Sequence, residues 1–318
     1  MQRMAMFMAA AAFLCGGMPH ATAEELTPSG PIVIDGRSDV VLRNLHVTAP
    51  DGNGITIRNS RNVRIENCRI GPCKGEGVSI YASEGVVITD CHFEDVRTGV
   101  YAVRSQRIEV LYNTCRNVHG PFPRGQMTQF NEVTGPGNRI SFNAVENILG
   151  ESYPEDVINL YKSHGTADDP IEVVGNLIRG GGPSRSGGGI MTGDAGGSHI
   201  IVRDNVLVDP GQYGVAIAGG THIQLLDNTV YGRQQPFTNV GLYVWEQYGT
   251  DCHSHVVRGN RVRWTNREGR PNHAWNGGNC GPVAGWNENT WNAEIGPDVL
   301  PEDLLKVDLR EHARNLER

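Results

Sequence analysis

One short stretch, "PEDVINLYKSHG" at residues 154–165, concentrates side chains that could carry out catalysis. A lysine can act as a base when its surroundings lower its pKa, and paired carboxyl groups can supply a general acid and a second carboxylate. Carboxylate and amide oxygens are also ligands for calcium. The stretch therefore predicts acid–base chemistry, with these members: Glu155, Asp156, Asn159, Tyr161, Lys162 and His164.

A repeat surrounds this stretch and must position it. Segments such as "VRIENCRI", "VVITDCHF", "IEVVGNLI" and "IQLLDNTV" each carry an apolar residue three positions before an Asn or Cys. That Asn or Cys recurs every 22 to 33 residues from Asn44 to Asn260, and many units also contain a glycine followed by a short alternating strand. Alternation buries every second side chain, and units of this length bury a core only by stacking on one another.

Stacked units make specific contacts predictable. We expect Val173, Val202 and Leu225 to lie above one another in a continuous interior formed by three parallel sheets. The aligned asparagines should form a buried hydrogen-bonded ladder, because interior amide groups need partners. Cys68 and Cys91 replace Asn in this ladder, either as small buried fillers, which we expect, or as a stacked disulfide.

The pattern resembles the right-handed parallel β-helix repeat of the pectate-lyase-like superfamily over residues 31–292. The resemblance implies an all-β solenoid of about nine to ten coils in a domain at residues 24–292. The ending "PEDLLKVDLREHARNLER" predicts a helix opened by Pro301, Glu302 and Asp303 in a capping segment at 293–318. We expect its leucines to cover the open end of the stack.

Insertions interrupt the repeat after Asn113, and in a solenoid such insertions become loops on one face, often the binding face. The stretch at 154–165 lies between two of them. If Ile158 and Leu160 point inward, Glu155, Val157, Asn159 and Tyr161 share the outer face.

Residues on the following coils complete the predicted site. Pairing Ile190 with Ile158 would set Asp194 beside Lys162, about 4.8 Å away. We therefore predict a groove with separate catalytic, substrate-binding and calcium-binding groups and no other cofactor. The catalytic group is Lys162, Asp156, Asp194 and His164, the substrate-binding group is Tyr161, Arg185, Tyr213, Tyr243 and Trp245, and the calcium ligands are Glu155 and Asn159.

Three functions fit this constellation. The first is a lyase that cleaves a uronic-acid polysaccharide by β-elimination, with Lys162 as base and calcium neutralising the uronate. The second is a glycoside hydrolase that uses two carboxyl groups from Glu155, Asp156 and Asp194. The third is a non-catalytic glycan-binding or surface-structural solenoid. We favour an enzyme, with the lyase ahead of the hydrolase and a polysaccharide as its partner.

Two local resemblances support the enzymatic hypotheses. Glu155 and Lys162-Ser163 have the spacing of the calcium-binding Glu and Lys-Ser base motif in the alginate lyase and chondroitinase B family. That family's second Glu is Val157 here, and its Arg on the following coil is replaced by the region around Asp194. The segments "EDVINLYKS" and "SGGGIMTG" resemble two strands of polygalacturonases, with Gly188 in place of their histidine.

The rest of the sequence bounds location and partners. A formal net charge of −7 does not indicate the excess of basic residues that is typical of proteins that bind nucleic acid. Arg3 followed by "MAMFMAAAAFLCGG" and the small residues of "ATAEE" reads as a secretory signal at residues 1–23, which predicts a secreted or periplasmic protein without membrane insertion. Disulfides form in such compartments, and Cys252 and Cys280 could bridge each other.

Signal cleavage predicts a defined N-terminus. Protein recovered from the periplasm or the medium should begin at Glu24 or within a few positions of it. Mass spectrometry of the intact protein measures this directly, and a cytoplasmic product that keeps Met1 would refute the prediction.

Overall fold

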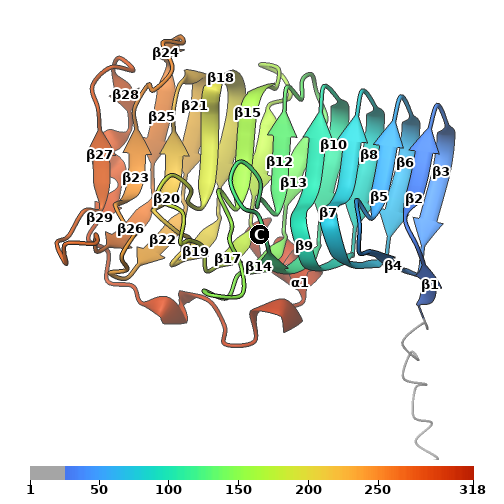
Figure 1. The fold of residues 1–318 in the computed structure, drawn as a ribbon. Helices are drawn as coiled ribbons and strands as arrows, with labels where there is room; N and C mark the ends of the chain where they lie inside the picture. Colours follow the sequence, from blue (N-terminus) through green and yellow to red (C-terminus); the bar gives the residue numbers. More distant parts are fainter. Residues whose placement is uncertain (1–25) are drawn as a thin grey trace, which may run out of the picture.

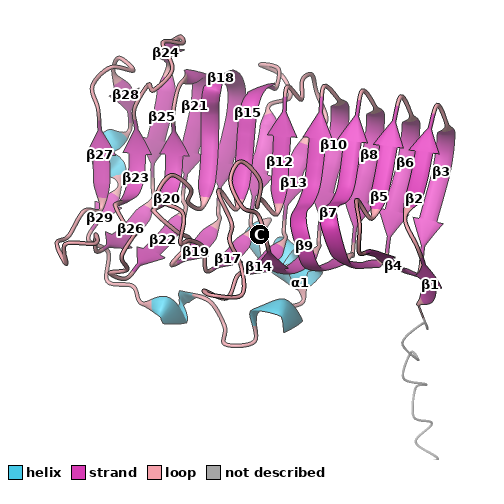
Figure 2. Cartoon of the chain, viewed as in Figure 1, coloured by secondary structure: helices cyan, strands magenta, loops and turns pink. Residues whose placement is uncertain are grey.

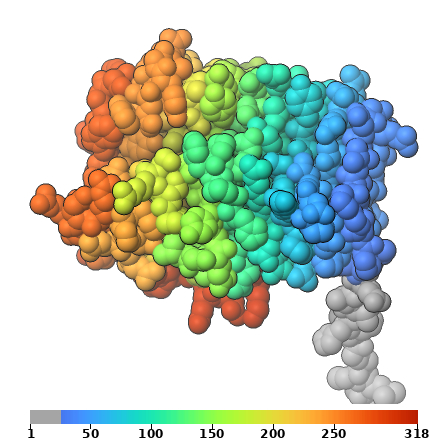
Figure 3. Space-filling model, in the orientation of Figure 1, coloured from blue at the N-terminus to red at the C-terminus, as the bar shows by residue number. Residues whose placement is uncertain are grey.

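The computed structural model describes residues 26–318, so the predicted signal at 1–23 lies outside the described residues. The chain winds into a parallel β-solenoid in which each coil lies beside the next, from the N-terminal to the C-terminal coils (Figure 1). The space-filling view shows the same order of coils along the long axis (Figure 3). Nearly all regular structure is strand (Figure 2), and no helix among the described residues is long and apolar enough to cross a membrane.

Three parallel sheets form the faces of the solenoid, and strands β7, β9 and β18 bend from one sheet into another. Sheet 1 contains β2 (Ile32–Asp35), β5 (Ile55–Arg58), β7 (Arg69–Tyr81), β9 (His92–Val103), β12 (Thr128–Asn131), β15 (Ile158–His164), β18 (Ile190–Arg203), β20 (Tyr213–Ile217), β23 (Val240–Val244) and β27 (Ala274–Asn276).

Sheet 2 follows sheet 1 within each coil. It contains β3 (Ser38–Arg43), β6 (Arg61–Glu66), β8 (Glu84–Thr89), β10 (Gln106–Leu111), β13 (Arg139–Ser141), β16 (Ile171–Val174), the end of β18, β21 (Gly220–Leu226), β24 (Cys252–His253), β25 (His255–Arg258) and β28 (Val283–Ala284).

Sheet 3 closes each coil. It contains β1 (Thr27–Ser29), β4 (Leu45–Ala49), the starts of β7 and β9, β11 (Thr114–Val118), β14 (Ala144–Glu146), β17 (Leu177–Arg179), β19 (Val206–Val208), β22 (Thr229–Gly232), β26 (Arg261–Trp264) and β29 (Thr290–Trp291).

The interior follows the repeat. Val173 pairs with Val202, Val202 pairs with Leu225, and all three are fully buried, which confirms the predicted coil-on-coil stacking. Each inward position of one coil therefore packs on the equivalent position of the next. Burial of such side chains stabilises the fold by about 1.5–3 kcal/mol for each large aliphatic residue.

The predicted asparagine ladder is present. The Asn176 amide nitrogen donates to Asn205 Oδ1 at 2.9 Å and to the carbonyl oxygen of Ile140 at 2.9 Å. Asn176 Oδ1 in turn accepts from the Nδ2 group and the backbone N–H of Asn143. The same pattern joins Asn113 to Asn143 and continues to the end of the solenoid through Asn228, Asn260 and Asn289. The ladder thus fixes the register between coils.

The cysteines agree with the sequence interpretation. Cys68 and Cys91 are buried and unbridged, so they act as fillers in the ladder, and the backbone N–H of Cys91 still donates to Asn113 Oδ1 at 2.9 Å. Cys252 and Cys280 form the expected disulfide near the C-terminal end of the solenoid.

The C-terminal segment does not cap the stack, and that prediction was wrong. After 3₁₀ turns at Trp286–Glu288, Pro297–Val299 and Leu304–Lys306, helix α1 (Leu309–Leu316) begins at the N-cap Asp308 rather than at Pro301. The apolar residues of the C-terminal segment pack on the outward side chains of sheet 3. Leu304 of the last 3₁₀ turn and Leu309 of α1 contact Ala144 and Leu177 there. Arg310 forms an ion pair with Asp90, so the chain end lies along the middle of the solenoid (Figure 1).

Removing one ladder side chain should destabilise the fold strongly. Asn176→Ala removes the acceptor of the Asn143 backbone N–H and of one Asn143 Nδ2 hydrogen, as well as a donor to the Ile140 carbonyl, and each buried group left unpaired costs about 1–3 kcal/mol. We expect the free energy of unfolding, measured by denaturant titration, to fall by at least about 3 kcal/mol. Asn67→Gly is the control, because Asn67 is exposed and its positive φ of 49° is one that glycine adopts easily. This substitution should change the free energy of unfolding by less than about 0.5 kcal/mol. Equal effects of the two substitutions would contradict a structural role for the ladder.

Candidate functional site

A cleft of about 590 Å³ lies on the outer face of sheet 1, over strands β12 to β27. Its floor is formed by a row of side chains that pair in register from coil to coil: Gln129, Asn159, Met191, Ala216, Tyr243 and Trp275. Its walls come from the inserted loops at residues 119–127, 180–189, 233–239 and 245–251, which contribute Phe122, Arg185, Asn239 and Tyr248 among others. The insertions thus border one face of the solenoid, as the sequence predicts.

A β-bulge decides which residues meet in the cleft. Ile158 pairs with Ile190 as expected, but one extra residue on β18 shifts the register, so Asp194 pairs with Tyr161. Gly193 makes this possible because its φ is +65°, and a Cβ there would lie 2.0 Å from the carbonyl oxygen of Gly219. The prediction that Asp194 lies beside Lys162 is therefore wrong.

Two aspartates are joined by one amide at the polar end of the cleft. Asn159 Nδ2 donates to Asp156 Oδ2 and to Asp194 Oδ2, both at 2.8 Å. Asn159 Oδ1 accepts from the amide of Gln129 at 3.2 Å, which orients the Asn159 side chain. The two aspartate oxygens therefore lie no more than twice 2.8 Å apart.

Asp156 is held almost completely out of solvent, with 5% of its surface exposed. Its Oδ1 accepts hydrogen bonds from the Tyr213 hydroxyl and from the backbone N–H of Gly188. Burial, with a smaller contribution from the charge of Glu155, raises the pKa of Asp156 to about 7, although these hydrogen bonds and that from Asn159 oppose the rise. Near neutral pH this carboxyl group can therefore hold a proton and release it.

Glu155 serves a different purpose in this arrangement. Its two oxygens accept hydrogen bonds of 2.6 Å from the hydroxyl groups of Ser184 and Ser186, which fasten the loop at 180–189 to the cleft. Calcium would need several free oxygen ligands. Each oxygen of Glu155 and the Oδ1 of Asn159 already accept one hydrogen bond, so a calcium ion at these residues would have to share the oxygens with their present donors.

The remaining predicted residues divide between the cleft and its surroundings. Tyr161, Arg185, Tyr243 and Trp245 line the cleft. Lys162 and His164 are exposed and lie outside the lining, and His164 contacts Ser198 Oγ at 3.1 Å. Tyr213 is fully buried and does not line the cleft, so the prediction that it contacts substrate is wrong, and its hydroxyl group instead donates to Asp156.

The outer-face assignment also needs one correction. Val157 is fully buried in the main core, whereas Asp156 reaches the cleft. Residues 155–157 precede β15, which begins at Ile158, so strict alternation does not extend to them. The prediction that Val157 lies on the outer face is therefore wrong.

Several cleft residues escaped the sequence analysis. Gln129 orients Asn159, and Arg124 stacks 4.0 Å above the Tyr101 ring while contacting Gln129 Oε1 at 3.3 Å. Tyr248 lines the same cleft as Asp194, and burial, followed by an interaction with Asp194, raises the pKa of its phenol. Trp275 lies on the last strand of sheet 1, in "HAWNGG", and an aromatic residue beside a glycine turn near two other tryptophans was the available signal.

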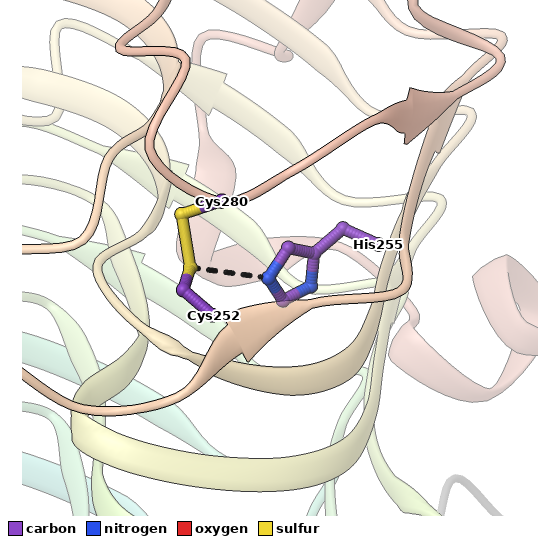
Figure 4. A group of neighbouring side chains, drawn as sticks. All are labelled: Cys252, His255 and Cys280. Carbon is purple, nitrogen blue, oxygen red and sulfur yellow. Dashed lines mark hydrogen bonds between the residues drawn. A yellow bond between two sulfur atoms is a disulfide. The ribbon is translucent and has the colours of Figure 1, made fainter.

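A second cluster, Cys252, His255 and Cys280, has the composition of a metal site (Figure 4). The two sulfur atoms are joined in a disulfide, and His255 Nε2 lies 3.4 Å from Cys252 Sγ. A cysteine binds a metal as a thiolate, and the two sulfur atoms of a disulfide are not thiolates. The cluster is therefore a structural clamp in this oxidised form.

Comparisons with known proteins agree with the architecture. The family model described as "Right handed beta helix region" matches residues 30–262. No curated protein matches the sequence. Among solved structures, the catalytic domain of a GH87 α-1,3-glucanase in complex with nigerose is similar, with a TM-score of 0.57 and 14% identity over 81% of this chain. The alignment covers 50% of the glucanase chain, so this chain spans about half the length of that structure.

Two further structures resemble the chain less closely. PfbA, a surface adhesin of Streptococcus pneumoniae, has a TM-score of 0.47 and 15% identity, with 75% of this chain and 65% of that chain covered. An alginate lyase from Paenibacillus sp. has a TM-score of 0.41 and 9% identity, with 81% of this chain and 99% of that chain covered. At these identities the similarity concerns the fold.

The raised pKa of Asp156 predicts a specific pH dependence of stability. The folded protein binds this proton more tightly than the unfolded chain, so its contribution is fully present below about pH 4 and is lost as pH rises to about 7. Asp156→Asn removes this titration, and the pH-dependent difference between the two proteins should reach at most about 4 kcal/mol. Denaturant unfolding between pH 4 and 8 measures it, and parallel stability curves for the two proteins would contradict the burial of an ionisable Asp156.

Proposed function

Since the chain belongs to the right-handed β-helix family, we propose that it is a glycoside hydrolase that cleaves a polysaccharide in the sheet 1 cleft. The observation that carries this proposal is the pair of carboxyl groups, Asp156 and Asp194, joined through Asn159. Glycoside hydrolysis needs one carboxyl group that keeps its proton and one that is ionised. The signal-like N-terminus adds the proposal that the protein acts outside the cytoplasm.

The environments of the two aspartates suggest their roles. Asp156, whose pKa burial raises to about 7, would donate a proton to the glycosidic oxygen of the leaving sugar. Asp194 is half-buried at the cleft surface and would attack the anomeric carbon as a carboxylate. Asp156, having lost its proton, would then take one from the water that hydrolyses the resulting glycosyl ester.

The spacing of the pair favours this double displacement. The oxygens held by Asn159 are at most twice 2.8 Å apart. Carboxyl groups in retaining enzymes lie about 5–5.5 Å apart, whereas inverting enzymes separate them by about 6.5–9.5 Å to admit a water. We therefore propose cleavage with retention of the anomeric configuration, which proton NMR of the first products can test.

The lyase hypothesis loses its main support. It depended on Lys162 as the base in the groove, and Lys162 lies outside the cleft lining and is not paired with Asp194. Glu155 and Asn159 Oδ1 already accept hydrogen bonds from protein groups, so they add no support for the calcium requirement of a lyase. We therefore place hydrolysis first, and the assay below also detects elimination.

Substitutions at the two aspartates should separate the hypotheses. We expect Asp156→Asn and Asp194→Asn each to lower turnover at least about a hundredfold, because each removes an acid–base or nucleophilic group. Lys162→Ala is the control and should retain most of the activity, because Lys162 is exposed outside the cleft. The panel should contain neutral polysaccharides, including α-1,3-glucan, and uronic-acid polysaccharides, with both reducing ends and unsaturated-uronate absorbance recorded.

The outcomes are distinct. Reducing ends without absorbance, lost in both aspartate variants, support the hydrolase. A gain in absorbance that depends on Lys162 supports the lyase and overturns the proposal. Binding without either product indicates a glycan-binding solenoid and also overturns it.

A further inference from the structure

Three large aromatic side chains remain half open to solvent at the C-terminal end of the cleft. Trp245, Tyr248 and Trp275 expose 40%, 48% and 44% of their surfaces and all line the cleft. The Trp245 and Trp275 rings lie 5.3 Å apart at an angle of 57°. Exposed aromatic rings gathered in a concave surface mark a binding site for a ligand with apolar faces. We call Trp245, Tyr248 and Trp275 the aromatic platform.

A close glycine contact and backbone hydrogen bonds support the platform. Gly277 packs directly under Trp245, since a Cβ there would lie 2.7 Å from Trp245 Cδ1. The backbone N–H of Gly277 donates to Val244, and that of Trp245 donates to Ile217, which ties the platform to neighbouring coils. Preorganised aromatic surfaces lose little conformational entropy on binding.

A carboxylate fastens the loop that carries Tyr248. Glu246 Oε1 accepts hydrogen bonds from the backbone N–H groups of Tyr248 and Thr250 at 2.6 and 2.9 Å. Asn279 brackets Glu246 by accepting from its backbone N–H and donating to its carbonyl oxygen. These hydrogen bonds therefore hold the loop that carries Tyr248 into the cleft that Asp194 also lines.

The platform is continuous with the aspartate pair. β20 and β23 follow β18 in sheet 1, so Trp245 stands two strand spacings, about 10 Å, from Asp194 along the solenoid axis. Trp275 lies on the next strand, β27. A ligand that contacts both Asp194 and Trp275 must therefore be a chain of several sugar units that runs across the strands.

The charges in the cleft select the kind of sugar. Glu155, Asp156 and Asp194 line the polar end, so a uronate carboxylate placed there would meet groups of its own sign. Of the lining guanidinium groups, Arg124 already faces Glu76 at 3.7 Å and stacks on Tyr101, and Arg185 is exposed on its loop. Arg185 has no ion-pair partner among the described residues, so the three carboxyl groups of the lining outnumber its one unpaired guanidinium group.

We propose that the cleft binds a neutral oligosaccharide rather than a uronate chain, with sugar rings stacked on Trp245 and Trp275 and the scissile bond at Asp156 and Asp194. This inference rests on the proposed hydrolase function for the position of the scissile bond. The stacking surface and the preference for an uncharged chain can be measured by binding alone. Pyranose faces carry C–H groups that pack well on indole rings, whereas their hydroxyl groups find partners at Gln129, Gln212 and Asn239.

Binding should be measured in the Asp156→Asn background so that the ligand stays intact while Asp194 keeps its charge. Isothermal titration calorimetry would compare neutral hexasaccharides of glucose, mannose and galactose with hexamers of galacturonate and guluronate. We expect at least one neutral series to bind more than tenfold more tightly than both uronates at low ionic strength. Adding Trp275→Ala should weaken that binding on the order of tenfold or more, through lost apolar contact.

Two further variants keep the test decisive. Trp275→Phe retains an aromatic ring and should recover part of the affinity, which covers the case in which Trp275→Ala disturbs the fold. Tyr81→Ala removes an aromatic residue of sheet 1 that is 44% exposed and lies outside the cleft, so it should leave affinity unchanged. Unchanged affinity in Trp275→Ala, or uronates that bind as tightly as the neutral chains, would overturn the inference. Platform-dependent binding without any cleavage by the parent protein would instead overturn only the hydrolase.

Discussion

The buried asparagine ladder sets the register of the coils, and every contact in the cleft depends on that register. Each ladder amide bonds to the coils on both sides of its own, as Asn176 does to Ile140 and Asn143 on one side and to Asn205 on the other. A slip of one residue would break several buried hydrogen bonds at once, which is far more costly than losing one exposed contact. Side chains on the outer face, such as Gln129 and Asn159, therefore meet their partners with little freedom.

A regular solenoid alone would offer only rows of identical positions, and the site arises where the regularity is interrupted. The bulge at Gly193 moves Asp194 by one position, which brings it within reach of Asn159. The inserted loops then close the sides of the cleft and cover Asp156. Rigid coils thus hold the chemistry in place, while local irregularities supply its geometry.

Burying Asp156 lowers the stability of the fold at neutral pH and raises the pKa of the carboxyl group into the range useful for proton transfer. A carboxyl group without solvent resists ionisation, so its pKa rises to about 7 and the fold loses stability when the proton leaves. Tyr213 and Gly188 limit this cost by donating hydrogen bonds to Oδ1. A carboxyl group that is buried beside a cleft at this cost is best explained by a function in the cleft.

The sequence by itself determined the solenoid, the ladder, the inward stacking of Val173 on Val202, and the clustering of Asp156 with inserted loops. These features follow from local patterns, because alternation and repeated asparagines specify which side chains face inward. Only the tertiary structure decided that Asp194 meets Asn159 and Tyr161 instead of Lys162 and that Tyr213 lies beneath Asp156. It also decided that the C-terminal leucines pack along sheet 3. A one-residue bulge and a long-range docking contact leave little trace in a linear pattern, since both depend on which backbone positions meet across separate coils.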